Sequence, residues 1–218
     1  MDSKKSSLVL ALHSSTEALG VGVWDCSRQP SSIHQIAIFP IGRSLSNRVI
    51  ECVEELLPSH SWPKLSRIAV AIGPGGFTST RLTVVMARTL AEQLNCPLDG
   101  ISSFELMAPR LIRSIPSQKR NKPFWIVQPL KRRGLVAGKY LIKQHDVSTL
   151  RNQNEVLEIE APHLLPLGST VKPAIEATED LHSDVIRLLN ISAASHHLKK
   201  KADWNEVLPI YPTSPVEG

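Results

Sequence analysis

The residues best placed to do chemistry are the glycines of the segment GPGGFTST, which begins at Gly73. We name residues 73–78 the glycine loop, with Gly73, Gly75, Gly76, Phe77 and Thr78 as its candidate residues. A helical pattern follows directly, and free N–H groups and the positive end of the helix dipole converge at a helix start, which favours phosphate binding. The segment lacks both the lysine of a P-loop and the spacing GxGxxG. We therefore expect the glycines mainly to supply backbone conformations that other residues disfavour, with phosphate binding as the alternative.

Other catalytic or metal-binding patterns have less support in the sequence. None of the eight histidines has another three or four residues away, and the adjacent His196 and His197 are expected at a solvated helix end. A Ser/His/Asp triad stays open, although no GxSxG elbow supports one. Cys26, Cys52 and Cys96 are scattered singly, which argues against a disulfide scaffold or a zinc site and fits a reducing cytosol.

The elements that would position the glycine loop alternate between strands and helices. Apolar runs predict strands over residues 8–13, 19–24, 33–39, 69–72 and 98–101, and a helical pattern covers residues 42–58. The helix after the glycine loop could be capped by Thr78, Ser79 or Thr80, and Asn95 with Pro97 should end it. Ser102 and Glu105 form a capping box that opens another helix.

The second half of the chain shows a weaker pattern. Residues 114–122 are polar and basic and predict a linker, so we expect domains over 1–113 and 114–218. Strands are predicted over residues 124–127, 135–142 and 156–159, a loop over 162–173 and an amphipathic helix over 180–200. The 218 residues suffice for a core in either domain arrangement.

Charge and hydropathy restrict the partners. The net charge of +5 permits contact with nucleic acid without requiring it. No stretch is long enough for a signal peptide or a membrane span, so we expect a soluble, cytoplasmic protein. Basic residues gather in the second half, where a solvated face or a tRNA-binding patch are the alternatives; they are Lys119, Arg120, Lys122, Lys131, Arg132, Arg133, Lys139 and Lys143.

Two segments carry a resemblance to a known family. The stretch GPGGFTSTRLTVVMARTLAEQLNCPLDGISSFELMA and the N-terminal LALHSSTEALGVGVWD resemble the TsaB (YeaZ) family, and PIYPTSPV near the C-terminus matches it faintly. The resemblance implies an α/β chain with the actin-like ATPase (ribonuclease-H-like) fold, in which two subdomains have mixed β-sheets flanked by helices. It also implies a role beside the catalytic subunit TsaD, which makes threonylcarbamoyladenosine next to the tRNA anticodon.

The same resemblance argues against catalysis by this chain. The family's first strand ends in an aspartate, whereas this chain has His13, a poor ligand for magnesium. Residues 124–143 contain no Asp or Glu, so the second carboxylate of a nucleotide site is also missing. We therefore expect a non-catalytic subunit without cofactor or metal. A degenerate nucleotide-binding enzyme and a tRNA-binding module stay open as alternatives.

The expected partner surface is the outer side of the helix after the glycine loop. Its core stripe is expected to consist of Leu82, Met86, Ala87, Leu90 and Leu94, which leaves Arg81, Val84, Val85, Arg88 and Glu92 on the opposite side. The candidate interface residues are Arg81, Val84, Val85 and Arg88, joined on the resemblance alone by Val49 and Val53, for which core packing is the alternative. The resemblance implies a TsaD-like partner, leaves open a TsaE-like ATPase and a homodimer, and implies that any tRNA contact is indirect or weak.

Overall fold

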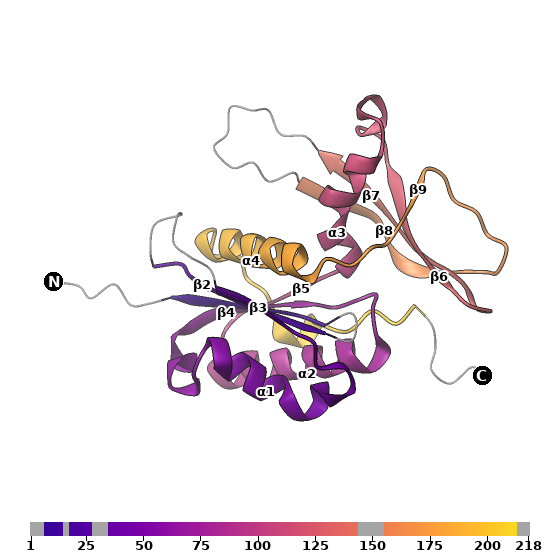
Figure 1. The fold of residues 1–218 in the computed structure, drawn as a ribbon. Coiled ribbons are helices and arrows are strands. Elements are labelled where there is room, and N and C mark those ends of the chain that lie inside the picture. Colours follow the sequence, from indigo (N-terminus) through magenta and orange to yellow (C-terminus); the bar gives the residue numbers. More distant parts are fainter. Residues whose placement is uncertain (1–6, 15–17, 28–34, 144–154, 213–218) are drawn as a thin grey trace. The chain divides into compact units, whose positions relative to one another are not determined.

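The computed structural model describes residues 7–14, 18–27, 35–143 and 155–212, and the chain forms two compact units (Figure 1). The first unit takes its described residues from 1–103 and 180–209, and the second takes them from 104–179 and 210–218. This division differs from the expected one, 1–113 and 114–218, because the chain returns to the first unit after residue 179.

The first unit is built on a five-stranded mixed sheet with the order β3-β2-β1-β4-β5. The strands β1, β2 and β3 are antiparallel, while β4 and β5 run parallel to β1. Their bounds are Leu8–His13, Leu19–Asp25, Gln35–Phe39, Leu65–Ala71 and Leu98–Ile101. All five predicted strands are present, and β4 begins earlier than expected.

Helices cover both faces of this sheet. Figure 1 shows α1 (Leu45–Leu56) and α2 (Phe77–Leu94) on one face and α4 (Leu181–His197) on the other. α4 packs on β1, β2, β3 and β4, so the helix expected within the second domain belongs to the first sheet. Short 3-10 helices lie at Gly42–Ser44, Ser59–Lys64 and Trp204–Glu206.

Two glycines of β2 let α4 approach the sheet closely. A Cβ atom added at Gly20 or at Gly22 would lie 2.7 Å from the side chain of Val185. At Gly22 it would also lie 2.8 Å from Leu189. Only a strand without side chains at these positions accommodates the buried face of α4, because interiors are close-packed.

The ends of α2 agree with the sequence prediction at one terminus only. Asn95 caps the C-terminus in the left-handed conformation with φ 49°, as expected for a short polar residue. At the N-terminus the cap is Gly76, with no side-chain hydrogen bond, so the expected cap at Thr78, Ser79 or Thr80 is wrong. These hydroxyl residues lie inside the first turn.

The second unit is a four-stranded sheet with the order β8-β7-β6-β9. Its strands are β6 (Phe124–Leu130), β7 (Gly134–Lys143), β8 (Glu155–Leu165) and β9 (Ala174–Glu176). Helix α3 (Ser103–Leu111) buries Phe104, Met107 and Leu111 together with apolar residues of β6 and β7. Further 3-10 helices lie at Ile112–Ser114 and Ser117–Lys119.

One prediction for this sheet is wrong, and one of its strands was not predicted. The loop expected over 162–173 begins as strand, because β8 continues to Leu165, and β9 was not foreseen. β8 is the edge strand of the sheet, where a proline such as Pro162 does not interrupt a ladder on both sides. β9 has three residues, too few for a periodic pattern.

Candidate partner-binding surface

The glycine loop is tied to the start of α3. Gly73 has φ 97°, a conformation that glycine adopts without strain. Its carbonyl oxygen accepts a hydrogen bond of 2.7 Å from the N–H of Ser103. The expected backbone role of the glycines is thus confirmed for Gly73. It is wrong for Gly76, whose φ of −60° is open to other residues.

Hydrogen bonds join the end of β1 to the first turns of α2. The hydroxyl of Ser14 donates to the carbonyl oxygen of Ser79 at 2.9 Å, and that of Thr80 donates to the carbonyl oxygen of Ser14 at 3.2 Å. The hydroxyls of Ser14 and Thr83 are also hydrogen-bonded to each other. Because these side chains are buried and satisfied, they fix the rotation of α2 about its axis.

The buried stripe of α2 consists mainly of small residues. Its buried residues are Thr80, Thr83, Val84, Met86, Ala87 and Ala91, of which only Met86 is large. Leu82 and Leu90 are only half-buried. The predicted stripe is therefore rotated about the helix axis relative to the buried stripe in the structure. Small side chains lie where the helix approaches the sheet most closely.

This rotation corrects the expected interface. Val84 is 0% exposed, so its expected place on the outer side of α2 is wrong. Val49 and Val53 of α1 are buried in the core, which was the alternative for both. Arg81 is exposed and Arg88 is half-buried. The two arginines and Val85 therefore remain as candidates.

The outer face of α2 presents an exposed apolar group. Val85 is 51% exposed and Phe77 is 41% exposed, and the Arg81 guanidinium lies 4.5 Å from the centre of the Phe77 ring. The neighbouring helix α1 carries Ile50, which is 53% exposed. We call Phe77, Arg81 and Val85 the α2 outer face. Apolar side chains with an adjacent arginine are typical of protein-binding surfaces.

Metal and nucleophile chemistry receives no geometric support in the described ranges. His13, at the end of β1, is completely buried. Within residues 7–14, 18–27, 35–143 and 155–212, no three His, Cys, Asp or Glu side chains are placed to hold a metal ion. Burial raises the pKa of the Cys26 and Cys96 thiols to about 11, so both are protonated and poorly nucleophilic near neutrality.

His196 is not at a solvated helix end, contrary to expectation. Its side chain is half-buried, and its Nε2 atom lies 2.9 Å from the hydroxyl of Ser7, which also bonds to Ser66. Burial, with the nearby His197 and Arg67, lowers the pKa of His196. The neutral ring is therefore favoured in the folded protein.

We expect His196 to make the protein less stable in mild acid. Because its folded pKa lies below the ordinary value of 6.5, the unfolded chain binds the proton first, and stability is lost as the pH falls through that value. Melting curves between about pH 7.5 and pH 5.5 should show a smaller decline for His196→Gln than for the parent. The exposed His60→Gln is the matched control; an equal decline in both variants would contradict the assignment.

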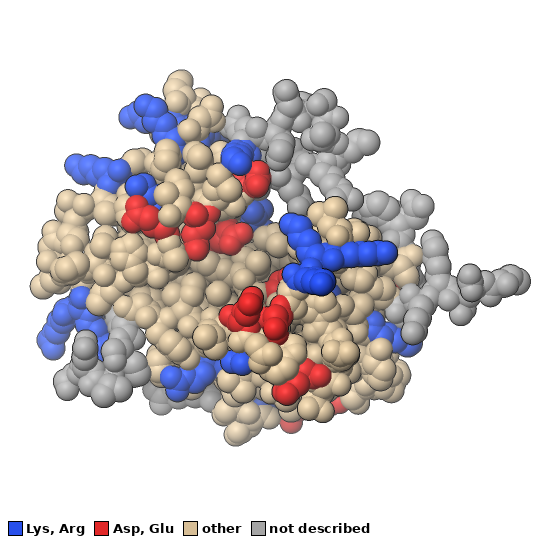
Figure 2. Space-filling model, turned by 180° about the vertical axis from the view of Figure 1, so that it is seen from behind, with Lys and Arg blue, Asp and Glu red and all other residues tan. Residues whose placement is uncertain are grey.

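Part of the basic group in the second unit is already engaged. Arg120 donates to the carbonyl oxygens of Ile115 and Arg113, and Lys139 pairs with Glu160 at 3.0 Å. Lys131–Arg133 are exposed at the turn between β6 and β7. Figure 2 shows basic side chains gathering in small groups, with acidic side chains in groups of their own. On the face that Figure 2 shows, the basic side chains form no single continuous patch.

None of the helices within the described ranges combines the length and the apolar character that crossing a bilayer requires.

The sequence is similar to proteins of threonylcarbamoyladenosine biosynthesis. A family model described as TsaD, tRNA N6-adenosine threonylcarbamoyltransferase, matches residues 40–128. The tRNA threonylcarbamoyladenosine biosynthesis protein TsaB of Bacillus subtilis (strain 168) is 32% identical over 102 residues, which are 46% of this chain and 43% of the relative. TsaB of Buchnera aphidicola (subsp. Acyrthosiphon pisum, strain APS) is 20% identical over 145 residues, which are 62% and 63% of the two chains. The matches thus span less than two thirds of either relative.

The fold is similar over almost the whole chain to solved structures from Pseudomonas aeruginosa. YeaZ from this organism has a TM-score of 0.64 at 19% identity, covering 94% of this chain and 99% of the other. An uncharacterised protein with similarity to peptidase YeaZ has a TM-score of 0.66 at 18% identity, covering 95% and 100%. The chain therefore has the actin-like ATPase (ribonuclease-H-like) fold, with two subdomains whose mixed sheets are flanked by helices. The chain is thus similar in sequence to two proteins named TsaB over about half of its length, and similar in fold to YeaZ over almost all of it.

Proposed function

We propose that this chain is a non-catalytic subunit supporting a TsaD-like enzyme in threonylcarbamoyl transfer to the adenosine beside the tRNA anticodon. The names of the matching relatives support the reaction, since both are tRNA threonylcarbamoyladenosine biosynthesis proteins. The observation that carries the subunit role is the α2 outer face, which exposes apolar side chains to solvent. Exposed apolar patches of this kind mark protein-binding sites. This transfer reaction would take place in the cytoplasm.

The residues at the sites where the fold would hold magnesium and phosphates support a non-catalytic role. β1 ends in His13, and β6 and β7 have no carboxylate. The carboxylates of the neighbouring β8 are engaged by other side chains: Glu160 by Lys139, Glu158 by the Tyr140 hydroxyl and Glu155 by Lys143. A hard cation would find few oxygen ligands here.

The α2 outer face sets the chemistry of the partner surface. Phe77 and Val85 require an apolar counterpart, and Arg81 favours a carboxylate or a backbone carbonyl beside it. The proposed TsaD-like partner would have to offer this combination. A TsaE-like ATPase, and a second copy of this chain in the absence of TsaD, stay open as further partners.

Reconstitution with the TsaD-like enzyme of the same organism tests this function. The mixture contains tRNA and an activated threonylcarbamoyl donor, whose leaving group is released on transfer. Nucleosides from the treated tRNA are separated by chromatography and quantified by mass spectrometry. Threonylcarbamoyladenosine should form when both proteins are present and fall to background when either is omitted. Equal product without this chain would refute the subunit role. Binding of magnesium ATP on the order of micromolar by the isolated chain, lost in Gly75→Val, would favour a nucleotide-binding enzyme instead.

A further inference from the structure

The turn that follows α4 holds three lysines in a defined backbone conformation. The N–H of Lys199 donates to the carbonyl oxygen of His196 at 3.0 Å, and that of Lys200 donates to Ser195 at 2.9 Å, the pair of bonds that makes a Schellman motif. Arg67, which is 2% exposed, donates to the carbonyl oxygen of Lys200 at 2.8 Å. We call Lys199, Lys200 and Lys201 the lysine turn; all three side chains are exposed.

The residue type at the centre of this turn is unusual. Lys199 has φ 51°, the left-handed conformation that glycine adopts most readily at this position of a helix end. A lysine here is favoured by the negative end of the helix dipole, but an ordinary helix end needs no lysine in this strained conformation. The turn therefore keeps a positive charge where backbone geometry favours glycine.

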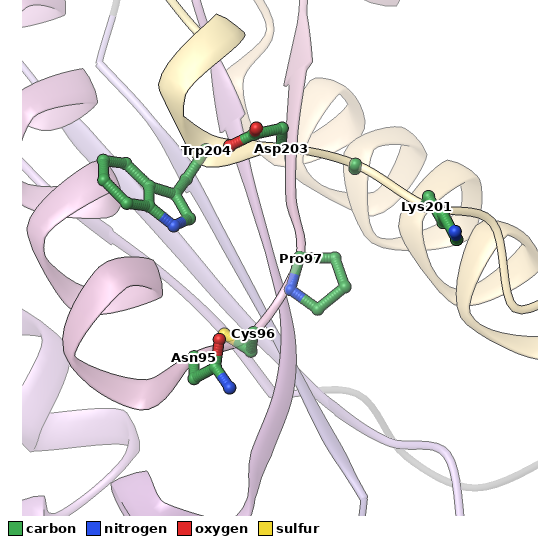
Figure 3. A pocket seen from close by; sticks show the side chains of 7 residues that line it. Asn95, Cys96, Pro97, Lys201, Asp203 and Trp204 are labelled. Atoms are coloured by element: carbon green, nitrogen blue, oxygen red, sulfur yellow. The ribbon is translucent and has the colours of Figure 1, made fainter.

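An open cavity of about 330 Å³ adjoins the lysine turn within the first unit. Residues 95–97 and 201–204 line it. In Figure 3, Trp204 and Lys201 lie on opposite sides of Pro97, and the nitrogen-bearing edge of the indole faces toward Pro97 and Asn95. The indole N–H makes no hydrogen bond within the described part of the chain, so it is available as a donor.

The lining combines the groups that recognise a nucleotide. Trp204 and Asn95 offer hydrogen-bond donors, and Asp203 and Asn95 offer acceptors, beside the apolar ring of Pro97. A nucleobase presents donors and acceptors at the edge of a flat apolar body, and the adjoining phosphates carry the negative charge that lysines bind.

We propose that this cavity and the lysine turn bind a single-stranded segment of RNA, with one base in the cavity and its neighbouring phosphates at Lys199, Lys200 and Lys201. The choice of RNA rests on the proposed function, which places a tRNA in the same complex. The proposal goes beyond it in giving this chain a direct RNA contact, at a site separate from the α2 outer face and from the basic residues of the second unit.

The test measures binding of the full chain alone to a fluorescein-labelled oligoribonucleotide of about ten uridines, by fluorescence anisotropy at several salt concentrations. The variant Lys199→Gly/Lys200→Ala/Lys201→Ala removes the charges while placing glycine in the left-handed position. The matched control is Lys119→Ala/Lys122→Ala/Lys131→Ala, which removes as many exposed charges from the second unit. An abasic oligonucleotide of the same length measures the contribution of the base.

The lysine-turn variant should bind at least about tenfold more weakly, and the slope of log affinity against log salt should fall by about 2, as three lost contacts to a single strand predict. The control should bind like the parent. The parent should bind the abasic strand several-fold more weakly than the RNA. In Trp204→Phe, which keeps a ring but lacks the N–H donor, the ratio of these two affinities should be smaller.

Three results would overturn the proposal: no binding by the parent, equal binding of RNA and abasic strand, or a loss in the control that the lysine-turn variant does not show. Because this assay contains no TsaD, a negative result would overturn the RNA site without bearing on the proposed subunit role. A negative result in the transfer assay would likewise overturn the subunit role without bearing on RNA binding by the isolated chain. The melting temperature of the lysine-turn variant checks folding, and should not fall, because glycine relieves the strain at residue 199.

Discussion

Replacing Asp99 with alanine is expected to destabilise the first unit by about 3–5 kcal/mol, because it leaves the buried Arg67 guanidinium without its carboxylate. Arg67 of β4 and Asp99 of β5 form a bidentate pair, with both N···O distances 2.7 Å. Ser192 of α4 also donates to Asp99, at 2.8 Å. The pair thus connects two neighbouring strands and the helix that covers them.

The size of this effect comes from desolvation rather than from the attraction itself. A guanidinium that is 2% exposed cannot recover its hydration when its partner is removed, whereas removing both charges leaves nothing unpaired. The double variant Arg67→Met/Asp99→Leu should therefore be much closer to the parent than Asp99→Ala. Thermal unfolding measures both, and the single variant should melt roughly 6–20 °C lower. If the double variant were as unstable as the single one, the loss of stability would come from losing the interactions of the pair and not from leaving the Arg67 charge unpaired.

Replacing Val85 with aspartate is expected to weaken the complex with a TsaD-like partner on the order of a hundredfold or more, because an unpaired buried charge costs several kcal/mol. In the isolated chain, Val85 is 51% exposed, so the same change should alter stability by only about half a kcal/mol. Melting of the variant alone and its co-elution with the partner from the same organism separate the two effects.

The control for this experiment is Gln93→Asp, an exposed position about two turns further along α2. It adds the same charge outside the α2 outer face and should leave co-elution intact. Normal melting of Val85→Asp with full co-elution would place the partner surface elsewhere. Normal melting with lost co-elution would support the subunit role.

The corrected interface shows how far helical periodicity can be trusted. The prediction placed the core stripe of α2 on Leu82, Met86, Ala87, Leu90 and Leu94, and Val84 opposite them. The structure buries Met86 and Ala87 as predicted, but it also buries Thr80, Thr83 and Val84, while the leucines are only half-buried. Two threonines are polar enough to look like surface residues, but their hydroxyls are satisfied by Ser14 and by the helix backbone. Ser14 lies 66 residues from Thr80 and 69 residues from Thr83 in the chain, so a local pattern alone could not identify it as their partner.

The sequence by itself determined the strands of the first sheet, the helix between the glycine loop and Asn95, and the lack of a carboxylate at the end of β1 and in β6 and β7. These features depend on local chemistry: apolar runs, a left-handed cap residue and residue type at a given position. Tertiary structure alone decided that α4 returns to the first sheet, where Gly20 and Gly22 admit Val185, and that the lysine turn adjoins the cavity at Pro97. An amphipathic pattern states which face of a helix is apolar. It does not state which sheet will cover that face, because packing depends on shape complementarity between residues far apart in the chain.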